Sequence, residues 1–182
     1  MPSPGFRAGA RSSLRAAAMA LPLLSACTPT LDWREVRPEG AGVLALFPCK
    51  PSKDTRRIVL AGAPLQLSLL ACQAGGASFA LGIADTTDPA RVAPTLEALR
   101  AAAAVNLGGT PAVVGAARVS GMTPQPLAQR VALQGRLPDG TAARQEVLFF
   151  VRGTVVYQAT VLGPRVEPGA IDTFFEGLKL ES

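Results

Sequence analysis

The chain has 182 residues, of which 48% are hydrophobic, and its formal net charge is +5. It contains no histidine, which excludes Ser-His-Asp and Cys-His catalysis as well as any metal site with histidine ligands. It also lacks a G-x-x-x-x-G-K-S/T phosphate loop and a G-x-S-x-G nucleophile motif. We therefore expect a protein that is not an enzyme and that uses no metal or cofactor.

The first 26 residues have the organisation of an export signal. Arg7, Arg11 and Arg15 precede an apolar stretch over residues 16–26, which is too short to span a bilayer. The stretch ends in Leu24-Ser25-Ala26-Cys27, which resembles a bacterial lipobox, where the leader is removed and the cysteine receives lipid. An ordinary secretory signal that leaves this cysteine unmodified, or a buried N-terminal helix, is the alternative.

The lipobox predicts how the chain is divided. We expect residues 1–26 to be a signal peptide, residues 27–41 a lipidated N-terminus and tether, and residues 42–182 a single domain. Thr28 follows Cys27 in place of the aspartate that usually retains such proteins at the inner membrane. The expected location is therefore the outer membrane, facing the periplasm, with inner-membrane anchoring as the alternative.

Removal of the leader also lowers the net charge. Three of the 18 basic residues lie in it, which leaves 15 basic residues against 13 acidic ones, a net charge of +2. No basic stripe is interleaved with aromatic residues, so we do not expect nucleic acid as a partner. The expected partners are the membrane, through the lipid anchor, and an envelope protein.

Trp33, the only tryptophan, lies in the expected tether. Its large amphipathic ring suits either of two roles: packing back against the domain, or anchoring at the membrane interface. The sequence favours packing, because apolar residues lie on both sides of it in this segment.

Cys49 and Cys72 form an even pair once Cys27 is lipidated. Each follows an apolar run that we expect to be a strand, and exported proteins work in an oxidising compartment. We predict a disulfide between them, worth about 3 kcal/mol because it closes a loop of about two dozen residues. Two separate buried thiols are the alternative.

The first half of the domain is expected to form an antiparallel meander. Strands are predicted over residues 42–47, 57–61, 65–72 and 78–84. Residues 50–57 are expected to be a basic loop that carries Lys50, Lys53, Arg56 and Arg57. This loop either contacts lipid phosphates or another anionic envelope polymer, or it is ordinary solvated surface.

The clearest local signal is for a helix in the middle of the chain. Asp88 suits the N-cap, Pro89 the first helical position and Gly108-Gly109 the stop. Because Pro94 would disturb the interior of a helix, we expect the regular part to begin at Ala93 or Pro94.

The second half is again expected to be mostly strands. They are predicted over residues 111–119, 130–137, 143–151 and 154–162, with a turn at 138–140, a helix from about Pro168 and a short closing strand at 178–180. Residues 147–151 are apolar at every position, which is typical of a strand that is covered on both faces.

The expected central helix and three further segments carry a resemblance to a known family. The three segments are Phe47-Pro48-Cys49-Lys50-Pro51, residues 149–158 (Phe-Phe-Val-Arg-Gly-Thr-Val-Val-Tyr-Gln) and Asp172-Thr173-Phe174-Phe175. Together they are similar to the PsbP-like family, which includes bacterial envelope lipoproteins of unknown function. The resemblance implies an α+β fold: a mostly antiparallel sheet covered by helices, arranged as a PsbP-like α/β/α sandwich.

This resemblance fixes no activity, because the fold hosts a photosystem subunit, a small-GTPase binder and lipoproteins. We expect a lipid-anchored envelope protein with a binding or supporting role. A periplasmic carrier of a hydrophobic ligand is the alternative. The carrier requires an apolar cavity of several hundred Å³ between helix and sheet, whereas a supporting protein requires a filled core and an exposed patch.

Overall fold

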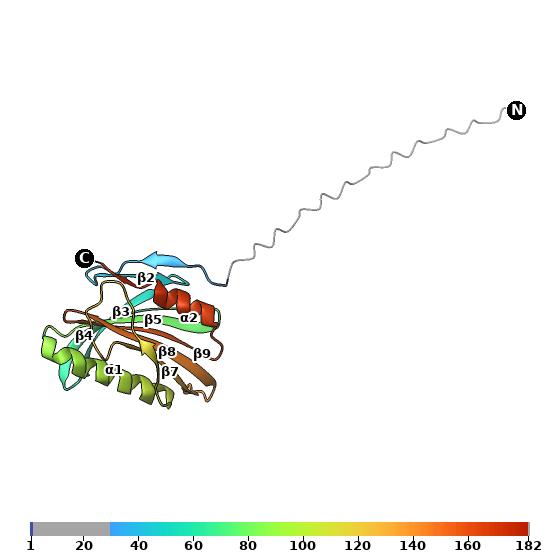
Figure 1. Cartoon of the computed structure of the whole chain (residues 1–182). Coiled ribbons are helices and arrows are strands. Elements are labelled where there is room, and N and C mark those ends of the chain that lie inside the picture. The colour runs from blue at the N-terminus through green and yellow to red at the C-terminus, as the bar shows by residue number, and fades with distance from the viewer. Residues whose placement is uncertain (2–29, 182) are drawn as a thin grey trace.

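The computed structural model describes Met1 and residues 30–181 of the chain. The expected signal peptide and Cys27 lie outside the described residues. Nearly half of the described residues lie in the strands of two antiparallel sheets (Figure 1). The larger has the order β3 (Ser52–Leu60), β4 (Ala63–Ala74), β5 (Ala77–Asp85), β9 (Val155–Gly163), β8 (Ala142–Arg152), β7 (Gln129–Arg136) and β6 (Ala112–Ala116). The smaller consists of β1 (Arg34–Val36), β2 (Val43–Phe47) and β10 (Lys179–Leu180).

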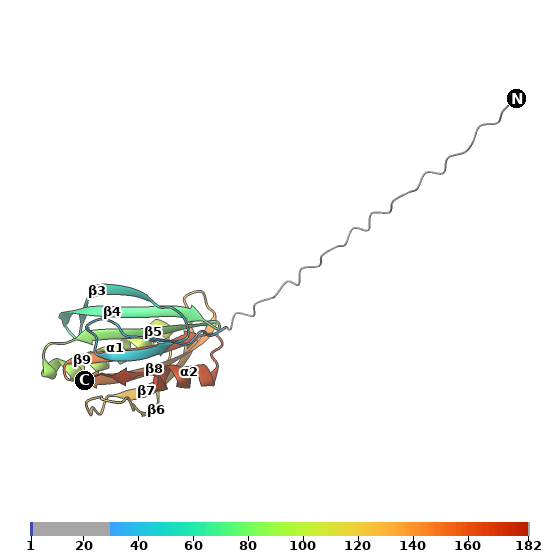
Figure 2. The same cartoon turned by 90° about the horizontal axis from the view of Figure 1, so that it is seen from above.

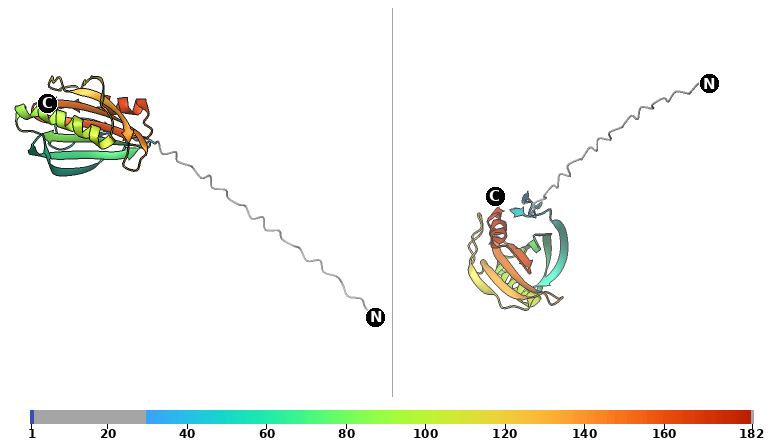
Figure 3. Two further views of the ribbon diagram at one scale, coloured as in Figure 1. Left: turned by 90° about the horizontal axis from the view of Figure 1, so that it is seen from below. Right: turned by 90° about the vertical axis from the view of Figure 1, so that its right-hand side faces the viewer.

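Two helices cover opposite faces of the larger sheet. Helix α1 (Val92–Leu107) lies on one face, and helix α2 (Pro168–Glu176) lies with the small sheet on the other (Figure 1). The seven strands lie side by side in Figure 2, and the view on the right of Figure 3 shows that the sheet is curved. The expected α+β class and the mostly antiparallel sheet are therefore confirmed.

Strand β8 shows why the sheet is covered on both sides. Successive residues of a strand point to opposite faces. Val147 and Phe149 pack with α1, whereas Leu148 and Phe150 pack in the core beneath α2 and β2. All four are buried, as the continuous apolar run in the sequence predicts.

The residues expected to flank the central helix do so, although the α-helix starts slightly earlier than expected. The Asp88 carboxylate accepts a hydrogen bond from the Ala90 N–H at 2.9 Å, and Pro89 opens a short 3₁₀ turn, η1 (Pro89–Arg91). The α-helix starts at Val92, slightly before the expected Ala93 or Pro94, because a proline in the first turn has no hydrogen bond to lose. It ends at Gly108, whose φ of 66° is left-handed.

The C-terminal end of α1 approaches β7 closely. A Cβ atom on Gly135 would lie 2.0 Å from the Leu107 carbonyl oxygen, and one on Gly109 would lie 2.3 Å from the Gln134 carbonyl oxygen. Both distances are far below any real carbon–oxygen contact. Glycine at these two positions therefore allows the helix to cross the sheet.

The expectation of a basic loop over residues 50–57 is wrong. Residues 52–60 form β3, which pairs with β4 along its whole length. Most of its side chains are exposed, so the apolar alternation that marks a half-buried strand is missing from the sequence. Pairing of its backbone with β4 makes it a strand.

The segment expected to be a tether contains β1, which pairs with β2. Trp33, just before β1, is partly buried, and its ring meets the Phe79 ring edge-on with the centroids 6.3 Å apart. Of the two roles considered for Trp33, packing against the domain is therefore confirmed.

Candidate functional site

A disulfide joins Cys49 to Cys72, with their Cα atoms 6.0 Å apart. Cys49 lies between β2 and β3, and Cys72 lies near the end of β4. The bond therefore connects the small sheet to the large one across 23 residues of sequence. The predicted disulfide is confirmed, and its role is structural.

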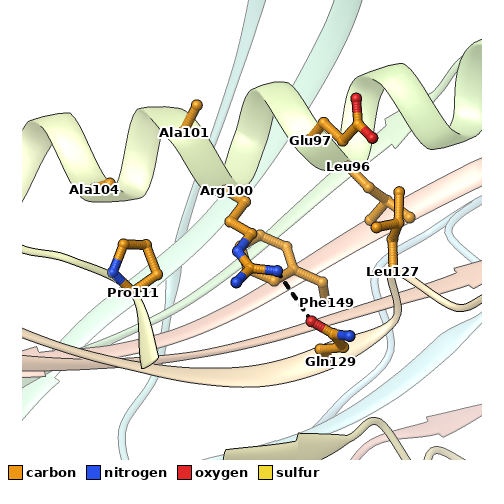
Figure 4. Close-up of a pocket in the computed structure, with 9 residues that line it drawn as sticks. All are labelled: Leu96, Glu97, Arg100, Ala101, Ala104, Pro111, Leu127, Gln129 and Phe149. Atoms are coloured by element: carbon orange, nitrogen blue, oxygen red, sulfur yellow. Dashed lines mark hydrogen bonds between the residues drawn. The ribbon is translucent and has the colours of Figure 1, made fainter. Parts of the chain in front are cut away.

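A pocket of about 440 Å³ lies between α1 and the sheet (Figure 4). We call it the α1 groove. Its lining is mostly apolar and comes from α1, from β7 and β8, and from the segments before β6 and β7. The lining residues are Leu96, Glu97, Arg100, Ala101, Ala104, Pro111, Leu127, Gln129 and Phe149.

The α1 groove has an apolar floor and a few polar groups. Leu96 and Phe149 are buried, and Glu97 and Ala101 on the helix are exposed. Across the groove, Arg100 Nη1 donates a hydrogen bond to Gln129 Oε1 at 3.0 Å (Figure 4). A guanidinium has five N–H donors, so Arg100 can bind an anionic group while it keeps this bond.

The surface beside the α1 groove is also apolar. Pro111, at the groove, leads directly into β6, which forms one edge of the large sheet. On β6, Val113 and Val114 are 52% and 55% exposed, and Val105 on α1 is 80% exposed. β6 carries no charge, whereas β3, at the opposite edge, carries four charged residues.

A cluster of charged residues lies beneath α2. Glu146 on β8 is only 2% exposed and accepts hydrogen bonds from Arg130, at 2.7 Å, and from Arg144. Arg130 also donates to Asp172 of α2 at 2.8 Å and lies over the Phe175 ring, 5.2 Å from its centroid. Burial lowers the pKa of Arg130, but its hydrogen bonds to Asp172 and Glu146 outweigh this effect and raise it.

This cluster holds α2 against the sheet. Its two arginines balance its two carboxylates, and each charged group has a partner of opposite sign within hydrogen-bonding distance. Such full pairing is what a buried carboxylate requires. We therefore regard the cluster as structural.

The four basic residues that the sequence singles out do not form one patch. Lys53 and Arg57 point to the face of the sheet that carries the small sheet, whereas Arg56 points to the other face. Arg56 Nε pairs with Asp54 at 2.5 Å, and Lys53 shares a shallow hollow with Glu39 and Asp85. Lys50 precedes the strand.

Within residues 30–181, no group of three or more histidine, cysteine, aspartate or glutamate side chains could hold a metal ion. In the same part of the chain, no helix combines the length and the apolar character needed to cross a membrane.

Comparison with known proteins gives no relative: no family model, no curated protein and no solved structure matches this chain. The α1 groove is the candidate site, because its lining is mostly apolar and includes an arginine. Sequence reasoning did not identify its residues. The available signal was the outer face of α1, where Ala101 and Val105 stand at positions that surface helices usually give to polar residues.

Proposed function

We propose that this protein is a lipid-anchored component of a bacterial cell envelope, and that its domain acts by binding rather than by catalysis. The α1 groove is its binding site. The ligand is an amphiphile with an apolar body and an anionic end, of the kind that fatty acids and lipids provide.

The size and lining of the α1 groove carry this proposal. About 440 Å³ between helix and sheet meets the requirement that we set for a hydrophobic-ligand carrier. The apolar body would lie on Leu96, Leu127 and Phe149, and the anionic end would meet Arg100. Because the rim is open at Ala101, the ligand would remain partly exposed to solvent.

We also propose that the fold is of the PsbP-like type. A sheet covered by α1 on one face and α2 on the other supports this proposal, together with the three sequence segments that resemble the family. An experimental structure that superimposes poorly on PsbP-like domains would contradict it.

A protein partner is the second candidate, favoured by the uncharged β6 edge and its exposed Val113 and Val114. Natural sheets usually protect their edges with charges or proline, as β3 does with Lys53 and Arg57. A β6 edge without charge would allow an extended segment of an envelope protein to pair with it. If β6 binds a partner, Val114→Lys should abolish partner binding and leave amphiphile binding unchanged.

Two fluorescent probes test the proposed amphiphile site. The anionic anilinonaphthalene sulfonate and the neutral phenylnaphthylamine should both bind the chain from Thr28 onward. Ala101→Phe fills the rim of the groove and should weaken the binding of both probes at least tenfold. Asn106→Phe places the same ring on an exposed part of α1 outside the groove and should leave binding unchanged.

Arg100→Gln tests the proposed anionic end. This substitution should weaken the binding of the anionic probe severalfold, because the charge-assisted hydrogen bond is lost. The binding of the neutral probe should stay nearly unchanged. Equal binding of both probes by wild type, Ala101→Phe and Arg100→Gln would contradict the proposal, provided that thermal unfolding shows the variants to be folded.

A further inference from the structure

Leu31 and Asp32, near the start of the described domain, are held against one end of the large sheet. The Asp32 N–H donates to the Pro48 carbonyl at 2.8 Å, and Leu31 packs into the core beneath α2. Leu31 also lies against the β4–β5 turn, because a Cβ atom on Gly75 would lie 3.2 Å from its Cδ2. The path of the chain toward its N-terminus therefore starts from this end.

We call this end of the molecule the tether end. It comprises residues 30–32, residues 48–50, the β4–β5 turn at 74–77 and the segment 163–167 between β9 and α2. The strand register brings these parts together: Ser52 pairs with Ala71, Ala74 with Ala77 and Ser78 with Leu162. At the opposite end lie the β3–β4 turn and the β8–β9 turn.

The tether end is close to the proposed lipid. Leu31 is four positions after Cys27, and a fully extended chain spans at most about 3.6 Å per residue, so their separation is at most about 14 Å. The large sheet is longer than this. Along β4, Pro64 and Gln73 are nine residues apart, which corresponds to about 30 Å at the usual rise of a strand.

We propose that the tether end lies on the membrane surface and that its partner there is the lipid headgroup layer. The inference rests on the proposed lipidation of Cys27. A tether this short keeps the tether end within about 14 Å of the anchored Cys27, so the domain cannot be inverted with only its opposite end on the headgroups. The chemistry of the tether end favours the upright orientation, with the strands pointing away from the membrane, over one in which the domain lies on its side.

The chemistry of the tether end suits a headgroup layer. Lys50 and Arg165 supply positive charge, Arg34 pairs with Asp32, and Glu167 is the acidic residue beside them. A mostly apolar hollow of about 230 Å³ opens at the same end, lined in part by Leu31, Phe79, Val166 and Ala170, and its charged lining residue is Glu167. The apolar lining suits an acyl chain, and Lys50 and Arg165, which lie outside the hollow, suit anionic headgroups.

This orientation leaves the α1 groove accessible. Its floor residue Phe149 lies five residues along β8 from Arg144, which pairs with Gly163 at the tether end. The groove is thus about 16 Å above the membrane and opens to the side. Ligands or partners can reach it from the periplasm without crossing the headgroup layer.

Energy transfer from tryptophan to a dansyl headgroup lipid tests the orientation. The experiment uses the full lipidated chain in vesicles of phosphatidylethanolamine and phosphatidylglycerol, with Trp33→Phe removing the only native tryptophan. Gln73→Trp places a donor on an exposed position near the tether end, and Val59→Trp places one on an exposed position near the opposite end. Transfer should be severalfold more efficient from the Gln73→Trp variant.

The outcomes separate this inference from the proposed lipidation. Equal transfer from both variants, or stronger transfer from Val59→Trp, would overturn the orientation while the anchor stands. A chain that does not float with vesicles would overturn the anchor and the orientation together. If Trp33→Phe prevents folding, amide hydrogen exchange of the wild type decides: vesicles should protect the turn at 74–77 and not the turn at 61–62.

Discussion

Tyr157 is the only tyrosine of the chain and is almost completely buried. Its ring stacks on that of Phe150, with centroids 4.8 Å apart, and its hydroxyl donates to the Ala41 carbonyl at 2.7 Å. The side chain thereby ties the segment before β2 to the centre of the large sheet. Burial raises the pKa of its hydroxyl above the ordinary value of 10.0, and the nearby charges of Arg152 and Asp85 act in opposite directions.

This pKa predicts a loss of stability in alkali. Because the folded chain holds the phenolic proton more tightly than the unfolded chain, the stabilisation is complete below the unfolded pKa of about 10 and is lost as pH rises through the folded pKa. Ultraviolet titration of the phenolate should give a midpoint above 10 for the folded chain and near 10 in denaturant. Tyr157→Phe should lose less stability than wild type above pH 10, and an equal loss would contradict the role of Tyr157.

Cys27 is the residue on which the proposed location depends. Labelled palmitate should enter the wild type when it is expressed in a bacterium and should not enter Cys27→Ser, because no other residue offers a thiol at a lipobox. Gel fluorography after membrane extraction measures the incorporation. Equal labelling of the two proteins would contradict lipidation at this residue.

At the scale of the elements, a buried carboxylate supports the position of α2. Glu146 on β8 accepts from Arg130, which in turn reaches Asp172 on α2. The helix is only nine residues long and has no side-chain hydrogen bond at its N-cap, so its position depends on tertiary contacts. Phe174 and the charged cluster provide these contacts on its two sides.

Removing this carboxylate should cost far more than removing an exposed one. Glu146→Gln leaves two arginines without their shared anion and should reduce the free energy of unfolding by about 3 kcal/mol, as breaking a buried ion pair usually does. Asp54→Asn makes the same chemical change in the exposed pair with Arg56 and should cost less than about 1 kcal/mol. Urea unfolding measures both, and equal losses would show that the cluster is not structural.

At the scale of the whole molecule, the disulfide lies at the same end as the proposed lipid. Cys49 and Cys72 join the two sheets at the tether end, close to where the chain leads toward Cys27. If Cys27 is anchored as we propose, this covalent link keeps the small sheet attached to the domain when the anchor is pulled. The far end carries the turns of β3–β4 and β8–β9 and has no such link among the described residues.

The four basic residues between positions 50 and 57 predict salt-sensitive membrane binding of the chain without its lipid. Replacing Lys50, Lys53, Arg56 and Arg57 together with glutamine should weaken sedimentation of the lipid-free chain with anionic liposomes, most strongly at low salt. Because Arg56 pairs with Asp54 on the other face of the sheet, Arg56→Gln alone should have no effect. Unchanged sedimentation of the fourfold variant would leave these residues as ordinary solvated surface.

Local sequence determined much of this structure. Asp88, Pro89 and Gly108 specify the ends of the central helix because capping hydrogen bonds and φ preferences involve only neighbouring residues. The apolar residues of β8 likewise predict coverage on both faces, and the cysteines at two strand ends predict the disulfide. The predicted lipobox also rests on local sequence, because its recognition would require only a short segment.

Tertiary structure decided the rest, because it depends on residues far apart in sequence. β3 and β1 are strands only through pairing with β4 and β2, and their exposed side chains give no periodic signal. Because β3 is a strand, Arg56 points to one face of the sheet, whereas Lys53 and Arg57, close to it in sequence, point to the other face. The α1 groove requires residues from α1, β7 and β8 to meet. Composition therefore excluded chemistry that depends on histidine, whereas only the crossing of α1 over the sheet formed the groove that we propose as the binding site.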